Sequence, residues 1–263
     1  MSNLTLAVRD STTMLRRNLL HARRYPSLTL NLLLAPVMLL LLFVYIFGDT
    51  MSAGIGDGGA DRSQYLAYIV PGILLLTIGG TTIGSAVSVA TDMTEGIIAR
   101  FRTMAIHRGS VLIGHVLGSV LQCVMSVLLV GAVAVAIGFR ATDATALEWI
   151  LAVGLLALVS LALTWIAVGM GLSSPNAEAA SNSALPLMIL PLLSSAFVPV
   201  DAMPGWFRPI AEYQPFTPAI ETLRGLLLGS EIGHNGWLAV AWCLALAALG
   251  YLWSKSLFVR DPK

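Results

Sequence analysis

Long stretches without a charged side chain constrain this sequence more than any other feature. Ser63 to Thr91 and Gly109 to Phe139 contain no Lys, Arg, Asp or Glu, and each is more than 25 residues long. An α-helix needs about 20 apolar residues to cross a bilayer. Charged residues make up only 11% of the whole chain, against roughly 25% in a soluble domain. The sequence therefore predicts an all-α integral membrane protein.

Six apolar segments predict six transmembrane helices: Leu28 to Phe47, Tyr65 to Ala90, Val111 to Phe139, Trp149 to Leu172, Ala179 to Val198 and Trp237 to Trp253. Pro186 and Pro191 make the fifth segment the most prone to a kink or a break. The first is longer than the apolar core of a signal peptide, so we expect it to remain as a span. The 263 residues of the chain leave no room for a separate soluble catalytic domain.

Residues 1–25 have a helical period, with apolar residues near one face and five Arg residues on the others. Such a basic helix lies in the membrane surface, among the lipid headgroups. Lys and Arg number 11 on the side of both termini and residues 92–110, and 4 on the opposite side. The positive-inside rule then places both termini in the cytoplasm. We expect a multi-pass protein of the cytoplasmic (inner) membrane of a bacterium.

The segment from Asp92 to Ser110 is the only internal one between apolar runs that carries a dense basic cluster. It holds Arg100, Arg102 and Arg108, with Asp92 and Glu95 ahead of them. We interpret it as a cytoplasmic helix over about residues 93–107 that docks a partner protein. The alternative is that these Arg residues only fix the topology.

The stretch from Pro199 to Gly236 is too polar to span a membrane and too apolar for a plain loop. Its prolines predict two short helices, about Gly205 to Tyr213 and Thr217 to Leu228, with Gly229 as a stop. We expect re-entrant helices over about residues 203–229 that dip into the outer leaflet and cap the helix bundle. A hairpin lying on the membrane surface is the alternative.

Several kinds of chemistry are missing from the sequence. Only Lys255 and Lys263 are present as lysines, and neither belongs to a GxxxxGK[ST] phosphate loop. His115 is the only titratable acid or base within a predicted span, which argues against an ion-coupled transporter. Cys123 and Cys243 lie in apolar runs without metal-ligand spacing. The sequence indicates no enzyme, no metal site and no nucleic-acid partner.

Small and polar residues recur at helical spacing within three predicted spans. Packing between helices explains such stripes. The functional interpretation is that they line a substrate path or contact a second copy of the chain. The candidates are Thr81, Ser85, Ser88, Gln122, Ser126, Asn182 and Ser194.

Two segments carry a resemblance to a known family: DMTEGIIARFRTMAIHRGSVLIG, from Asp92 to Gly114, and FVPVDAMPGWFRPIAEYQPFTPAIETLRGLLLG, from Phe197 to Gly229. With the basic N-terminus and six spans, they resemble the ABC-2 type permeases, and among them the daunorubicin-resistance-like drug-efflux group. The resemblance implies a six-helix transmembrane domain over residues 26–263. Ala105 departs from the family pattern, which usually has Pro there.

The resemblance also implies partners. The permease pairs with a second, usually identical copy, and with two cytoplasmic ATPase subunits that bind ATP and Mg, so this chain needs no cofactor of its own. Residues 93–107 are then the coupling helix, with docking residues Glu95, Gly96, Arg100, Arg102, Ile106 and Arg108. The outer gate is expected at Pro204, Trp206, Phe207, Tyr213 and Pro215.

The function that follows is ATP-driven export of a lipophilic substrate, such as a drug, a lipid or a natural product, by a subunit embedded among membrane lipids. A lipid- or polysaccharide-exporting permease of the same family is one alternative. A stand-alone membrane enzyme or channel is another.

Overall fold

The computed structural model describes residues 26–46, 62–96, 108–141 and 144–259, and every regular element among them is helical. The first helices are α2 (Pro26–Tyr45), α4 (Arg62–Thr94), α6 (Arg108–Ala136) and α7 (Ala146–Ser173). They are followed by α8 (Ala177–Ile189), the 3-10 turns η1 (Leu190–Leu193) and η2 (Val200–Ala202), α9 (Arg208–Tyr213), α10 (Phe216–Leu228) and α11 (Asn235–Val259). The predicted N-terminal helix over residues 1–25 lies outside the described residues.

Each of the six predicted spans contains a helix in the structure. Four of them are long and apolar enough to cross a membrane: Ser63–Thr94, Leu112–Ala136, Ala146–Ser173 and Asn235–Phe258. The first and fifth correspond to shorter apolar helices, Leu34–Tyr45 and Ala177–Leu193. The prediction of an all-helical membrane protein is confirmed, while the count of six complete spans stays a prediction.

The predicted break in the fifth span is present. α8 ends at Ile189, the chain continues as η1 to Leu193, and irregular turns follow to Pro199. Pro191 lies at the start of η1. Its ring clashes with the preceding helical turn, and without an N–H it cannot donate the hydrogen bond that would continue the α-helix. The span therefore changes from α-helix to 3-10 turn within its apolar run.

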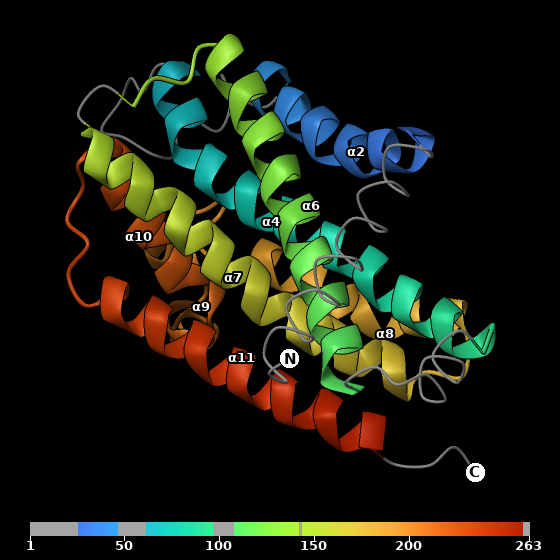
Figure 1. The fold of residues 1–263 in the computed structure, drawn as a ribbon. Helices are drawn as coiled ribbons and strands as arrows, with labels where there is room; N and C mark the ends of the chain where they lie inside the picture. Colours follow the sequence, from blue (N-terminus) through green and yellow to red (C-terminus); the bar gives the residue numbers. More distant parts are fainter. Residues whose placement is uncertain (1–25, 47–61, 97–107, 142–143, 260–263) are drawn as a thin grey trace.

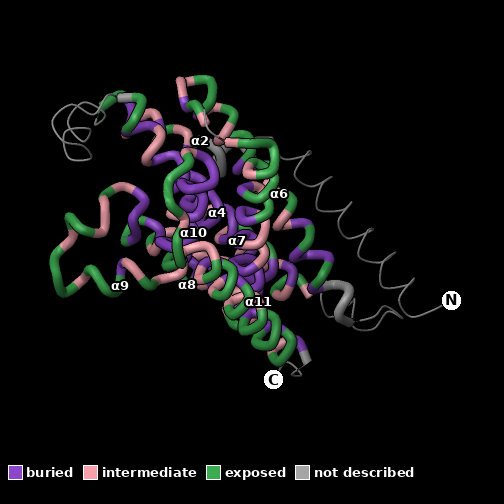
Figure 2. Tube along the Cα trace, turned by 90° about the vertical axis from the view of Figure 1, so that its left-hand side faces the viewer, coloured by how far each residue is buried: buried purple, intermediate pink, exposed green. Residues whose placement is uncertain are grey.

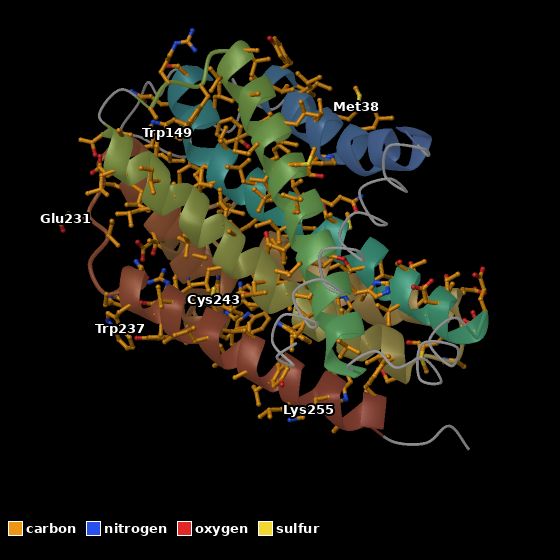
Figure 3. All side chains as sticks on the ribbon, viewed as in Figure 1. Met38, Trp149, Glu231, Trp237, Cys243 and Lys255 are labelled. Atoms are coloured by element: carbon orange, nitrogen blue, oxygen red, sulfur yellow. The ribbon has the colours of Figure 1, made fainter. Side chains whose placement is uncertain are left out.

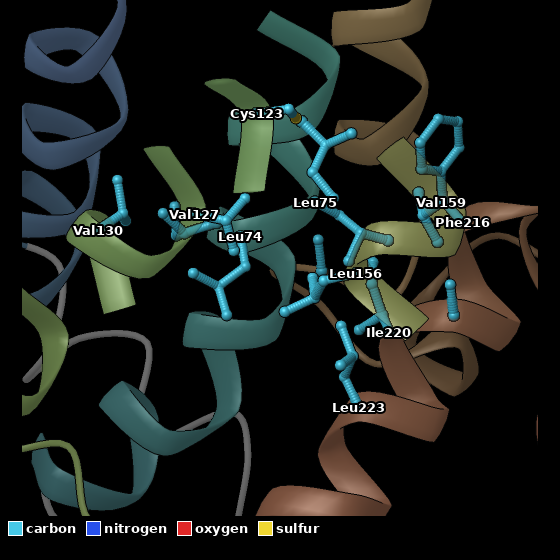
Figure 4. Close-up of a cluster of buried hydrophobic side chains, with 14 of the residues drawn as sticks. Leu74, Leu75, Cys123, Val127, Val130, Leu156, Val159, Phe216, Ile220 and Leu223 are labelled. Atoms are coloured by element: carbon cyan, nitrogen blue, oxygen red, sulfur yellow. The ribbon is translucent and has the colours of Figure 1, made fainter. Parts of the chain in front are cut away.

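The bundle is built around α4, which contacts α2, α6, α7, α8 and α10. In Figure 2, α4 and α7 are the most buried segments, whereas α9 and α11 are largely exposed. Leu75, Leu156 and Ile220 come from three helices and point toward one another in the core (Figure 4). Exposed Leu, Met and Val side chains on α6 and α11 suit contact with lipid.

The helix ends gather at two ends of the bundle (Figure 1). One, which we call the Asp92 end, carries the last turns of α4, α7 and α11 and the first turns of α6 and α8. The other, the Arg224 end, carries the starts of α4, α7 and α11 together with α9 and α10. Trp149 and Trp237 lie at the Arg224 end and Lys255 lies toward the Asp92 end (Figure 3). Aromatic rings at helix starts match the belt expected at a membrane interface.

Candidate functional site

A buried contact between a histidine and a carboxylate joins α4 to α6 at the Asp92 end. His115 Nε2 lies 2.9 Å from Asp92 Oδ2, and each residue is only 6% exposed. Asp92 lies in the last turn of α4, where the helix dipole disfavours a negative charge. His115, about two turns into α6, supplies the compensating partner. The pair ties together the two helices that flank residues 97–107.

An apolar cluster lies at the same end of the bundle as this contact. Its buried side chains come from α4, α6, α7 and α11: Val89, Leu112, Val116, Trp165, Val168 and Phe258. Polar groups buried at such an end depend on their partners. Asp92 and His115 are 23 residues apart, and nothing in the sequence indicates that they meet.

α4 extends beyond the predicted end of the second span. It runs to Thr94, and Glu95 and Gly96 form the turn after it, with Gly96 at φ +69°, in the left-handed region that favours glycine. The first two residues of the segment predicted as a helix over about 93–107 therefore belong to α4. Arg100, Arg102 and Ile106 lie outside the described residues, and Arg108 is the first residue of α6. Docking by these residues stays a prediction.

The candidate path residues do not gather on one face. The hydroxyl of Thr81 donates to the Thr77 carbonyl at 2.7 Å and that of Ser126 to the Gln122 carbonyl at 3.0 Å, which is the arrangement expected for helix packing. Ser85 and Ser194 are buried, and Gln122 is half-buried. Ser88 and Asn182 are exposed. These two are the only candidates in the set whose side chains face outward in this structure.

One exposed face of α4 carries small residues. Gly80, Gly84 and Ser88 are spaced at four residues, and a Cβ placed on either glycine would meet no atom within 4 Å. At Gly79, one residue away, an added Cβ would clash with the Leu187 carbonyl oxygen of α8. α4 therefore packs closely against α8 on one side, and on another side the described residues leave a face of small residues uncovered.

An apolar cavity of about 240 Å³ lies between α4, α6, α7 and α10 toward the Arg224 end. None of the candidate path residues lines it. Its walls include Val70, Leu74, Val127, Gly131, Trp149, Leu156 and Leu227. An apolar cavity of this kind accepts hydrocarbon and offers no polar contact for specificity.

At the other end of the bundle, a buried guanidinium connects three elements. Arg224, on α10, is 8% exposed. Its Nη1 lies 2.6 Å from Glu221 Oε1, and its Nη2 donates to the carbonyls of Tyr68 at 3.0 Å and Ser195 at 3.1 Å. The guanidinium carbon also lies 3.8 Å from the centroid of the Tyr68 ring, within cation–π range. We call these four residues the Arg224 network.

The Arg224 network and its neighbours satisfy the backbone where the fifth span breaks. Ser195 O accepts from the Tyr68 hydroxyl at 3.0 Å as well as from Arg224, and Ser195 N donates to Thr217 Oγ1 at 3.2 Å. Gln214 Nε2 donates to the Leu193 carbonyl at 2.6 Å. Irregular backbone at membrane depth is tolerated only where protein or water satisfies it. Side chains from α4, from α10 and from Gln214 at the end of α9 fulfil that condition here.

The predicted short helices after the fifth span are present as α9 and α10, and Gly229 ends α10 with φ +71° as predicted. α10 is buried against α4, α7 and α11. The five predicted gate residues lie at or near the surface. Pro204, Trp206 and Tyr213 are exposed, and Phe207 and Pro215 are half-buried. The structure thus gathers buried polar groups at Arg224 and not around these five residues.

The Arg224 network left one signal in the sequence. Glu221 and Arg224 are three residues apart in an otherwise apolar helix, a spacing that places them on one face. Their partners Tyr68 and Ser195 could not be found in this way, because they belong to distant segments. The described residues contain no group of three or more His, Cys, Asp or Glu side chains that could hold a metal ion.

Comparison with known proteins adds evidence of a different kind. A family model described as ABC-2 type transporter matches residues 10–228. The chain is 28% identical over 226 residues to the daunorubicin resistance ABC transporter permease protein DrrB1 of Streptomyces coeruleorubidus, covering 85% of this chain and 77% of that protein. It is 25% identical over 242 residues to the probable doxorubicin resistance ABC transporter permease protein DrrC of Mycobacterium tuberculosis, covering 88% and 83%. Nodulation protein J of Rhizobium meliloti is 26% identical over 235 residues, with 82% of each chain covered.

Proposed function

The chain belongs to the ABC-2 type transporter family, and from that premise we propose that it is the membrane subunit of an ATP-driven exporter of a lipophilic substrate. The family match, which extends over residues 10–228, is the observation that carries the proposal. Two relatives are named for resistance to daunorubicin and doxorubicin. These names favour an amphipathic drug or natural product as the substrate. Lipid remains the closest alternative in chemical terms.

Energy for transport then comes from a separate ATPase subunit, which binds ATP and Mg. The Asp92 end is the proposed docking side, because residues 97–107 connect α4 and α6 there and carry Arg100 and Arg102. Lys255 and the C-terminal end of α11 lie on the same side. With the excess of Lys and Arg on the side of the termini, this end is proposed to face the cytoplasm. The Arg224 end then faces outward, with α9 and α10 entering the outer leaflet.

Co-purification tests the proposal directly. An ATPase with a GxxxxGK[ST] phosphate loop is expected to purify with the chain in a fixed ratio. Arg100→Glu combined with Arg102→Glu is expected to lower recovery of that ATPase at least roughly tenfold, equivalent to about 1.4 kcal/mol of binding energy, and to abolish export. The Arg100→Lys, Arg102→Lys variant is the matched control, because it keeps both charges. Export that survives the double reversal contradicts docking through these residues.

Ser88, one of the predicted candidates, shares an exposed face of α4 with Gly80 and Gly84, and this face is available to a second copy or to substrate. We expect Gly84→Leu to leave the amount of folded protein unchanged and to lower export about tenfold, because a large side chain would block close approach. Gly154→Leu on α7 is the control, since that glycine is exposed and a Cβ there also meets no atom within 4 Å. Transport assays in vesicles compare the two. Equal activities would remove the α4 face from the proposed mechanism.

A further inference from the structure

We propose that Arg224 is a positioning residue that latches the broken fifth span to α4 and thereby holds the Arg224 end closed between transport events. The proposal rests on the export function above and deepens it, by naming the contacts that must open. It starts from one geometric fact: the guanidinium bonds to Glu221 in its own helix and to the Tyr68 and Ser195 carbonyls in two other segments.

The two kinds of contact respond differently when α10 moves. Glu221 lies one turn before Arg224 and moves with it, so their contact at 2.6 Å is independent of the position of α10. The carbonyls of Tyr68 and Ser195, and the Tyr68 ring, belong to α4 and to the segment after η1, so a shift of α10 separates them from the guanidinium. The charge therefore keeps a counterion in both arrangements. Opening breaks only the carbonyl and ring contacts of Arg224. The guanidinium charge is therefore never left without a counterion.

Ser195 is the point at which the latch acts. Its carbonyl accepts both from Arg224 and from the Tyr68 hydroxyl, and the residue is 1% exposed. The two donors come from different helices, the Tyr68 hydroxyl from α4 and the Arg224 guanidinium from α10. A shift of α10 against α4 therefore changes the contacts of this one carbonyl.

One member of the network reaches the molecular surface. The Glu221 side chain is 28% exposed, whereas that of Arg224 is 10% exposed. The carboxylate therefore gives the guanidinium a path to the surface once the carbonyl contacts are lost. The exposed gate candidates Trp206 and Tyr213 lie outside this network, so the buried contacts at Arg224 are the stronger candidates for control of the closed state.

Accessibility of residue 195 is the most direct measurement. Ser195→Cys is introduced with Cys123→Ala and Cys243→Ala, which removes the two native thiols. The variant is reconstituted with the ATPase in nanodiscs and treated with a charged maleimide, with and without ATP and vanadate. Slow labelling without nucleotide is expected, because the site is closed, and faster labelling when the ATPase is held in its nucleotide-bound state. Ser160→Cys in the same background is the control, because Ser160 is fully buried in α7 and is expected to remain unlabelled.

Three substitutions then test Arg224 itself. Arg224→Lys keeps the charge but cannot hold both carbonyls in the planar geometry of a guanidinium, so labelling at position 195 without nucleotide is expected to rise about tenfold, the effect of losing one charge-assisted hydrogen bond. Tyr68→Phe removes one hydroxyl and keeps the ring, so a smaller rise is expected. Glu221→Gln removes the counterion that accompanies the open state, and is expected to reduce labelling in the nucleotide-bound state.

The outcomes separate the latch from the export function. Failure of any ATPase to join the complex overturns the proposed function, while labelling of the permease alone still measures the effect of Arg224→Lys. Unchanged labelling at position 195 in both Arg224→Lys and Tyr68→Phe, with normal protein yield, overturns the latch. If Arg224→Lys does not accumulate, Tyr68→Phe and Glu221→Gln decide, because opposite changes in labelling are expected only for a latch.

Discussion

His115→Leu is expected to lower the free energy of unfolding of the chain by about 1 to 3 kcal/mol, the usual cost of removing one partner from a buried polar contact. Asp92 is 6% exposed and lies in the last turn of α4, where the helix dipole adds to the penalty of losing the imidazole. Unfolding by increasing SDS in mixed micelles measures the change. Because α4 and α6 flank residues 97–107, loss of ATP-driven export is expected together with the loss of stability.

A double variant separates charge from packing. Asp92→Leu combined with His115→Leu removes both partners and leaves apolar groups of similar volume, a replacement that is often neutral or stabilising for buried pairs. The double variant is therefore expected to recover most of the stability that His115→Leu loses. Exchange of the two residues, Asp92→His with His115→Asp, keeps the pair and puts the imidazole at the helix end that favours a cation. A single His115→Leu variant as stable as the wild type would show that Asp92 is satisfied without His115.

Much of the fold could be predicted because the apolar runs determine where helices must lie. Pro186 and Pro191 marked the break that separates α8 from η1, and Gly229 marked the end of α10. The predicted second span ends at Ala90, whereas α4 continues to Thr94. The last turn of α4 contains Asp92, whose partner His115 lies 23 positions further along the chain and could not be found from local sequence.

The polar networks were less predictable because their partners are not local. In the sequence, Arg224 is one of only four Lys and Arg residues on the outer side. The two carbonyl groups that it bonds lie 156 and 29 positions away along the chain. The Thr81 and Ser126 hydroxyls looked available for a substrate path, but each bonds to a carbonyl of its own helix. Helical periodicity shows which residues share a face. It does not show which face is covered by another helix.

Gly79 and Gly80 make this last distinction measurable, because two adjacent glycines of α4 are expected to respond to the same substitution with opposite signs. Gly79→Ala would make its Cβ clash with the Leu187 carbonyl oxygen, so the two backbones must move apart because no side chain can rotate away. A loss of about 1 to 3 kcal/mol is expected, as for overpacked cores.

Gly80→Ala meets no atom within 4 Å, so it keeps the packing and gains helix propensity, a stabilisation of up to about 1 kcal/mol. SDS titration of both variants, measured against the wild type in the same micelles, gives the two signs in one experiment. A destabilised Gly80→Ala would mean that this face is covered after all, in which case the loss should grow with protein concentration if the cover is a second copy. A neutral Gly79→Ala would mean that α4 and α8 can move apart without cost, which contradicts the close packing on which the position of the broken fifth span depends.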